Sequence, residues 1–169
     1  MAAQFVMFAG YNAWANERVY AAAAALSDAD YRADRGAFFK SVHGTLNHLL
    51  VADRIWMRRF TGAGDAPDRL DAILFEDRDA LHAARRAEDE RILRYVGGLS
   101  DEALSGRIRY RAISSPAEFE QPLAAVLSHV FNHQTHHRGQ VHCLLTGLTG
   151  QAPSLDLVLF QRESGIGVA

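Results

Sequence analysis

The chain has almost no cysteine, lysine or proline, and it lacks long apolar runs. Its 169 residues include one cysteine (Cys143), one lysine (Lys40) and four prolines. A single cysteine cannot form a disulfide within the chain, which is typical of a reducing compartment. No stretch approaches the roughly 18 consecutive apolar residues of a membrane-spanning helix. These absences exclude a disulfide-stapled domain, and they predict no membrane span.

The chain also lacks an excess of charge of either sign. The formal net charge is −2, from 18 basic and 20 acidic residues, so neither nucleic acid nor an anionic membrane is an expected partner. Opposite charges are interspersed, as at 88–91, and this pattern predicts a solvated helix face that also includes Arg85 and Arg86. The N-terminal region has no basic segment before its apolar residues, so we expect a cytoplasmic protein. Cys143 lies among apolar residues and is expected to pack in the core.

The length and the 49% hydrophobic content predict one globular domain over residues 1–169. Apolar residues recur at helical spacing in four long segments. These segments cover residues 4–26, 42–61, 76–96 and 122–145. Ser41 is the expected N-cap of the second, and Gly97, Gly147 and Gly150 are expected helix ends.

Shorter elements fill the connections. Alternating residues at 107–111 and 118–120 predict a small β-hairpin with its turn at 114–116, and residues 154–163 have helical character. Four amphipathic helices with so little strand predict an all-α four-helix bundle. The connections 62–75 and 97–121 are long enough to permit a crossover, so periodicity alone leaves the helix directions open.

The fourth helical segment contains an unusual run of histidines. Residues 128–142 hold five of the eight histidines. His133 and His137 fall on the buried stripe of this helix, where leucine would be expected. The stripe consists of Val126, Val130, His133, His137, Val141, Leu144 and Leu148.

Two histidines four residues apart lie on one helix face, about 6 Å from each other, and both can reach one metal ion. His133 and His137 satisfy this spacing, as do His129 and His133, but the first pair lies more centrally on the stripe. A third ligand must come from another helix. His48 is the best candidate because core residues flank it, whereas His43 lies on a different face. From the residues alone, hydrogen-bonded core histidines remain an alternative.

The other candidate residues are weaker. His82, His129, His136 and His142 are expected on the surface or beside the site. No carboxylate stands out as a general base, and Glu17, Asp53 and Glu120 are expected to be surface or supporting groups. Trp14, Asn16, Trp56 and Tyr110 are candidates to line a pocket, with ordinary core or interface positions as the alternative.

Several motifs in this order resemble the DinB/YfiT-like family, whose members are regarded as metalloenzymes. The motifs are Tyr11-Asn12-Ala13-Trp14-Ala15-Asn16, the segment from Ser41 through His48 to Trp56, and Asn132-His133 followed by His136-His137-Arg138-Gly139-Gln140. The resemblance implies an up-down-down-up bundle, often a homodimer. It also implies that His48, His133 and His137 bind a divalent cation, usually zinc or nickel.

Three neutral ligands leave a cation its charge and an open coordination position, which is typical of a catalytic site. Such a site would lower the pKa of a bound water or hold a thiol as thiolate. We therefore expect a metal-dependent enzyme acting on a small molecule, with a low-molecular-weight thiol as the favoured partner because the family includes thiol-dependent transferases. The alternatives are a metal-dependent hydrolase and a non-catalytic metal-binding or stress-response protein.

Overall fold

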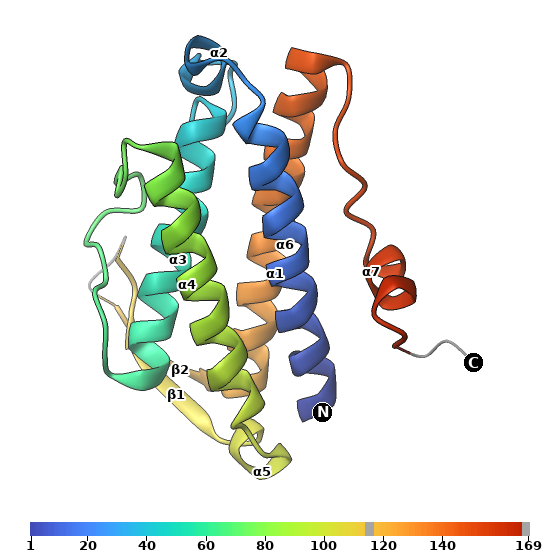
Figure 1. The fold of residues 1–169 in the computed structure, drawn as a ribbon. Coiled ribbons are helices and arrows are strands. Elements are labelled where there is room, and N and C mark those ends of the chain that lie inside the picture. The colour runs from blue at the N-terminus through green and yellow to red at the C-terminus, as the bar shows by residue number, and fades with distance from the viewer. Residues whose placement is uncertain (114–116, 167–169) are drawn as a thin grey trace.

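Four long helices form the body of the protein. The computed structural model describes residues 1–113 and 117–166. The long helices are α1 (Ala2–Ala24), α3 (Val42–Thr61), α4 (Arg78–Gly97) and α6 (Leu123–Thr149). In Figure 1, α1 and α6 run in one direction and α3 and α4 in the other, so the arrangement is up-down-down-up. The predicted all-α bundle is confirmed.

The parallel orientation of α3 and α4 requires a long connection. Residues 62–77, which we call the crossover, run back along the length of the bundle before α4 begins (Figure 1). Around the bundle, α1 contacts α4 and α6, and α3 contacts the same two helices. Helices α1 and α3 are therefore diagonal partners. The outer side of the seam between α3 and α6 faces away from α1.

Short elements lie at the ends and along the sides of the bundle. They are α2 (Asp28–Arg32), α5 (Asp101–Leu104), α7 (Leu157–Glu163) and the antiparallel strands β1 (Arg107–Arg111) and β2 (Glu118–Pro122). The strands pair with Tyr110 opposite Phe119, and β2 contacts α6. The predicted hairpin is confirmed, while its predicted turn at 114–116 lies outside the described residues.

Capping groups set the helix ends. The Ser41 hydroxyl accepts the Gly44 N–H at 3.0 Å, and Gly62 closes α3 in the left-handed conformation (φ 72°), so the predicted bounds of this helix are confirmed. Helix α4 begins two residues later than predicted because the Asp77 carboxylate caps Ala80. Gly147 does not end α6, since the left-handed cap is Gly150 (φ 76°).

Two hydrophobic clusters with a polar layer between them form the centre of the bundle, and a third cluster of Tyr11, Ala15 and Phe160 joins α1 to α7. On each long helix, buried polar residues separate the positions that belong to one cluster from those that belong to the other. The first cluster includes Val19, Leu46, Leu50, Leu81, Val141 and Leu145, and the second includes Phe5, Met57, Ile92, Leu127 and Phe131. The polar layer contains Asn12, Asn16, Asp53, Arg85, Asp89, Gln134 and Arg138.

Ion pairs and amide contacts connect the groups of this polar layer across the helices. Arg85 lies 2.8 Å from Asp53 of α3 and 3.0 Å from Asp89 of its own helix. Asn12 and Asn16 of α1 donate to Asp89 at 3.1 and 3.0 Å. The Arg138 guanidinium of α6 donates to both asparagine side-chain oxygens. The two arginines balance the two aspartates, so the layer joins all four helices without net charge.

The predicted solvated face of α4 is therefore wrong in part. Arg85 is 1% exposed, and Glu88 and Asp89 are 6% exposed, whereas Arg86 is on the surface as predicted. Asp53 is also buried, at 1%. A buried charge requires partners, and Asp53 of α3 and the two asparagines of α1 lie on other helices. Sequence spacing along α4 does not show them.

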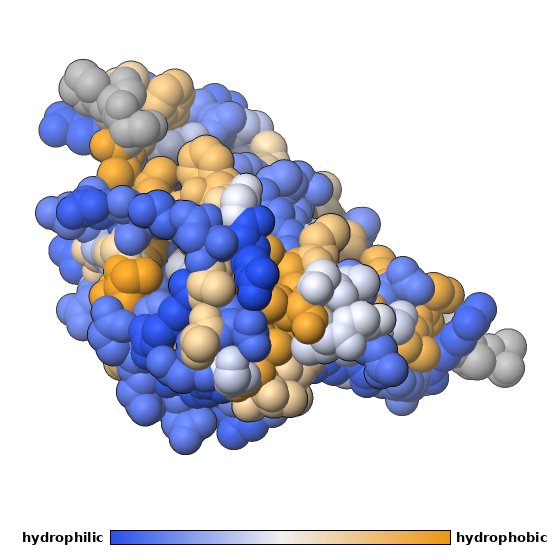
Figure 2. Space-filling view, turned by 90° about the horizontal axis from the view of Figure 1, so that it is seen from above, coloured by the Kyte–Doolittle hydropathy of each residue, from blue (hydrophilic) through white to orange (hydrophobic). Residues whose placement is uncertain are grey.

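The C-terminal segment lies against the outside of α1. Phe160 of α7 packs on Tyr11 and Trp14, and Figure 2 shows this segment projecting to one side of a mostly hydrophilic end of the bundle. None of the described helices has the length and apolar character needed to cross a membrane. Cys143 is exposed, which corrects its predicted packing role, because Val141 and Leu145 take the inward positions of that turn.

Replacing Arg85 with methionine is expected to destabilise the fold strongly. The substitution leaves Asp53 and Asp89 buried without their cation, a change that typically costs about 3–5 kcal/mol. Urea unfolding monitored by circular dichroism measures it. The matched control is Arg86→Met on the neighbouring exposed position, for which we expect little change. Equal effects of the two substitutions would contradict the role of the polar layer.

Candidate metal centre

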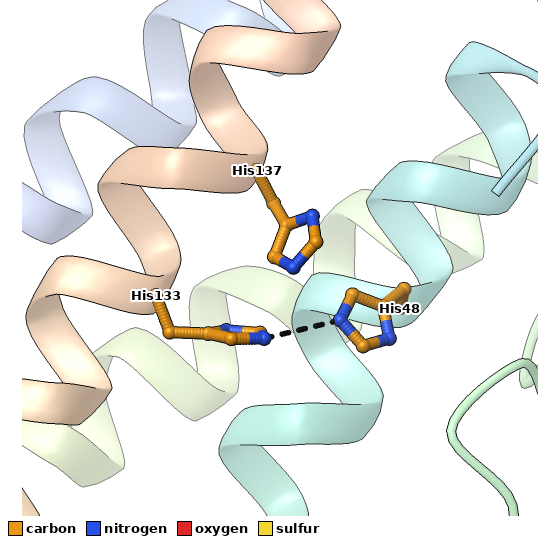
Figure 3. A group of neighbouring side chains, drawn as sticks. All are labelled: His48, His133 and His137. Carbon is orange, nitrogen blue, oxygen red and sulfur yellow. Dashed lines mark hydrogen bonds between the residues drawn. The ribbon is translucent and has the colours of Figure 1, made fainter. Parts of the chain in front are cut away.

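Three histidines from two helices converge on one point. His48 comes from α3, and His133 and His137 come from successive turns of α6 (Figure 3). The Nε2 atoms of His48 and His133 are 3.2 Å apart, and one nitrogen from each of the three rings lies within 4.8 Å of the others. Two ligands of a tetrahedral site with bonds of ~2.0–2.1 Å are separated by about 3.3 Å. The three histidines are therefore positioned to hold a metal ion.

Hydrogen bonds at the far side of two rings fix which nitrogen faces this point. His48 Nδ1 lies 2.7 Å from the Leu70 carbonyl oxygen, which can only accept, so Nδ1 carries the proton. His137 Nδ1 lies 2.7 Å from Gln140 Oε1 in the same way. Both rings then present an unprotonated Nε2. This is the arrangement of metal-binding histidines, whose other nitrogen donates to a carbonyl or carboxylate.

Burial keeps the rings in the form that binds a cation. Desolvation lowers the pKa of His48 to about 4, and desolvation with the nearby His137 lowers that of His133 to about 3. The pKa of His137 is also lowered, mainly by burial. Without a cation, the Nε2–H of His133 can donate to the unprotonated Nε2 of His48 at 3.2 Å, and a metal ion would take the place of that proton. The residues present therefore fit a divalent metal ion.

Phe39 covers one side of the group. Its ring stacks on His48 with centroids 3.7 Å apart and meets His137 edge-on at 5.5 Å. The loop that carries it can approach α3 because residue 44 is glycine. A Cβ at Gly44 would lie 2.2 Å from the Phe39 carbonyl oxygen. Any side chain at position 44 would displace the loop and with it the cover of the site.

A pocket of about 340 Å³ opens on the other side. Besides His48 and His133, its lining includes Trp56 and Tyr110, the two predicted residues that the structure places here. The other lining residues are Ala52, Ile55, Arg59, Leu70, Ala112, Ile113, Phe119 and His129. Trp14 and Asn16 were predicted to line a pocket but belong to α1, the diagonal partner of α3. Trp14 packs against α7, and Asn16 belongs to the polar layer.

Two buried side chains of α3, those of Asn47 and His43, hold the crossover against this helix. This role was not predicted from the sequence. The Asn47 side chain, fully buried, accepts from the N–H groups of Leu74 and Phe75 and donates to the Phe75 carbonyl. His43, buried on the same helix, lies 3.0 Å from that carbonyl through Nε2. These contacts hold the segment that supplies the Leu70 carbonyl. The position of an asparagine in the sequence does not indicate such a role, because its partners are main-chain atoms of a loop.

The remaining candidates lie elsewhere. His82 is half-buried against Tyr20 and contacts Glu17, while His136 is exposed beside His137. His129, expected only as a neighbour, lines the pocket with its ring 5.8 Å from that of His133. The carboxylates that were weighed are engaged away from the three histidines. Glu17 pairs with Arg86, Asp53 with Arg85, and Glu120 with Arg107 and Arg109.

Comparison with known proteins identifies the family of the chain. The family model described as the DinB family matches residues 1–165. The chain belongs to the DinB family. It is 23% identical over 171 residues to Protein DinB of Bacillus subtilis (strain 168), covering 91% of this chain and 92% of that DinB protein. No solved structure matches the chain significantly. The three histidines of this DinB-family chain lie within the matched region.

The metal-free protein should lose stability in acid through the buried histidines. Unfolded histidine takes up a proton near pH 6.5, whereas folded His48 resists protonation until about pH 4. The unfolded state binds more protons between these values, so the free energy of unfolding falls as pH decreases through this window. We expect the difference between wild type and His48→Gln to shrink from pH 7 to pH 4 in urea unfolding. Asp53 also titrates in this range, and its contribution cancels in the difference. A difference that does not change with pH would contradict the assignment.

Proposed function

We propose that this DinB-family protein binds one divalent metal ion through His48, His133 and His137 and acts as a metal-dependent enzyme on a low-molecular-weight thiol. The observation that carries the proposal is the convergence of three neutral ring nitrogens beside a pocket. A cation held by three histidines supplies a Lewis-acid centre that lowers the pKa of a bound thiol or water. Imidazole ligands suit zinc, with nickel as the main competitor.

The surroundings of the histidines favour a thiol over water. No aspartate or glutamate belongs to the described lining of the pocket. Hydrolysis uses a positioned base or acid to move protons during the reaction. A thiol needs less help, because a coordinating thiol is deprotonated outright at a metal. The sulfur would then bond to an electrophilic carbon while the bond from that carbon to its leaving group breaks. The leaving group would take the bonding electron pair, and the thiol proton would pass to solvent.

One residue supports a hydrolase as the second candidate. His129 lines the same pocket, and burial together with the charge of Arg59 lowers its pKa, so the ring is neutral at pH 7 and able to accept a proton. A hydrolase would use this ring as its base. A protein that binds metal without turnover is the third outcome of the experiments below.

Metal content tests the first half of the proposal. Protein purified without a histidine tag and loaded with zinc or nickel should contain one ion per chain by elemental analysis. The variants His48→Ala, His133→Ala and His137→Ala should each lose it. Gln140→Leu should weaken binding about 10- to 100-fold, because Gln140 orients His137. His82→Ala is the matched control and should retain the ion. Unchanged metal content in the His48 and His137 variants would exclude this ligand set.

Thiol binding and turnover test the second half. Cobalt-substituted protein should develop a thiolate-to-cobalt charge-transfer band on addition of cysteine or other small thiols. Metal-loaded protein should catalyse thiol transfer to a chromogenic electrophile, and chelator or His137→Ala should abolish the reaction. Ester hydrolysis without thiol transfer, lost in His129→Gln, would instead establish the hydrolase. Absence of both activities would leave a metal-binding protein.

A further inference from the structure

The pocket beside the three histidines has aromatic walls. Trp56 of α3 meets Tyr110 of β1 edge-on, with centroids 4.9 Å apart, and Tyr110 stacks on Phe119 of β2 at 5.7 Å. His129 of α6 closes the opposite side, edge-on to Trp56 at 5.5 Å. Helix and hairpin thus build one apolar, flat-sided space. Such walls suit a flat or chain-like apolar group.

A single arginine supplies the permanent charge of this space. Arg59 lies over the rings of Trp56 and Tyr110, at 4.3 and 4.9 Å from their centroids. One of its nitrogens donates to the Arg111 carbonyl at 2.6 Å, which fixes the side chain in place. Within the described parts of the chain, no carboxylate forms an ion pair with Arg59, whereas Arg107, Arg109 and Arg111 of the nearby hairpin all pair with glutamates.

The positive charge of Arg59 affects the titration of His129 in the same pocket. It contributes to the lowered pKa of His129, after the larger effect of burial, so the two side chains share one electrostatic environment. Burial also lowers the pKa of Arg59 itself, yet a guanidinium remains charged at neutral pH. A partly desolvated cation without a carboxylate partner attracts an anion more strongly than a solvated one does.

We propose that this pocket binds an elongated small molecule with an apolar body and one carboxylate, which the Arg59 guanidinium holds at the end remote from the three histidines. The proposal extends the function proposed above, on which it rests for the reacting end of the molecule. The Arg59 guanidinium lies over Trp56, which follows His48 by eight residues on α3, or about 12 Å along the helix axis at 1.5 Å per residue. A ligand that reaches from one end to the other must therefore be long.

Binding to the metal-free protein tests the anion site separately from the metal. The probes are phenylbutanoate and phenylhexanoate, each compared with its neutral amide. The readout is the indole N–H resonance of Trp56, identified by its persistence in Trp14→Phe. We expect phenylhexanoate to shift this resonance and to bind at least about tenfold more tightly than its amide, as charge-assisted hydrogen bonds allow.

Two arginine variants locate the effect. Arg59→Gln should abolish the preference for the acid, and Arg59→Lys should keep part of it because the charge remains while the planar fork is lost. Arg58→Gln is the matched control, since Arg58 is exposed and bonds to the Gly64 carbonyl outside the pocket. It should keep the full preference.

The outcomes separate the two proposals. Equal binding of acid and amide by wild type, an unmoved Trp56 resonance, or equal losses in the Arg58 and Arg59 variants would overturn the anion site. If the protein prefers the acid but binds no metal, the anion site is supported and the metal-dependent function is contradicted. If it binds metal but does not prefer the acid, the metal site is supported and the anion site is contradicted.

Discussion

The buried ion pairs of the polar layer are the constraint on which the arrangement of the bundle depends. Hydrophobic contacts tolerate sliding of one helix along another, whereas Arg85 must lie against Asp53 and Asp89 at hydrogen-bonding distance. Arg138 extends the constraint to α6 through the two asparagines of α1. A shift of one helical turn, about 5.4 Å, would leave these charges buried without partners. The layer therefore fixes the axial register of the four helices.

This register is what brings the histidines together. Arg138 directly follows His137, and adjacent residues on a helix point about 100° apart. One therefore faces the polar layer while the other faces His48. On α3, Asp53 lies five residues after His48 and also points to a different side. The same two helices thus carry structural charges toward the bundle axis and neutral ring nitrogens toward the pocket.

The helical periodicity of the sequence made part of this histidine arrangement predictable. The i, i+4 spacing of His133 and His137 on an apolar stripe and the core neighbours of His48 were sufficient to select three residues that the structure brings together. The four helices were predicted from the helical spacing of apolar residues, and the hairpin was predicted from the alternation of polar and apolar residues. The burial of Arg85 and Asp89 could not be predicted, because Asp53 and the two asparagines that contact them lie on other helices and an isolated charged helix looks solvated. The carbonyl that orients His48 was also out of reach, since main-chain positions of a loop have no sequence pattern.

The crossover makes the geometry of the three-histidine group depend on chain topology. His48 meets a carbonyl 22 residues later and a ring nitrogen 85 residues later, so no helical hairpin of this chain contains the assembled group. The length of residues 62–77 sets where the Leu70 carbonyl lies relative to His48. An insertion or deletion in this segment would turn the imidazole away from its neighbours although it removed no ligand. Relatives that differ in crossover length would then differ in the chemistry of the site while their helices and histidines stayed the same.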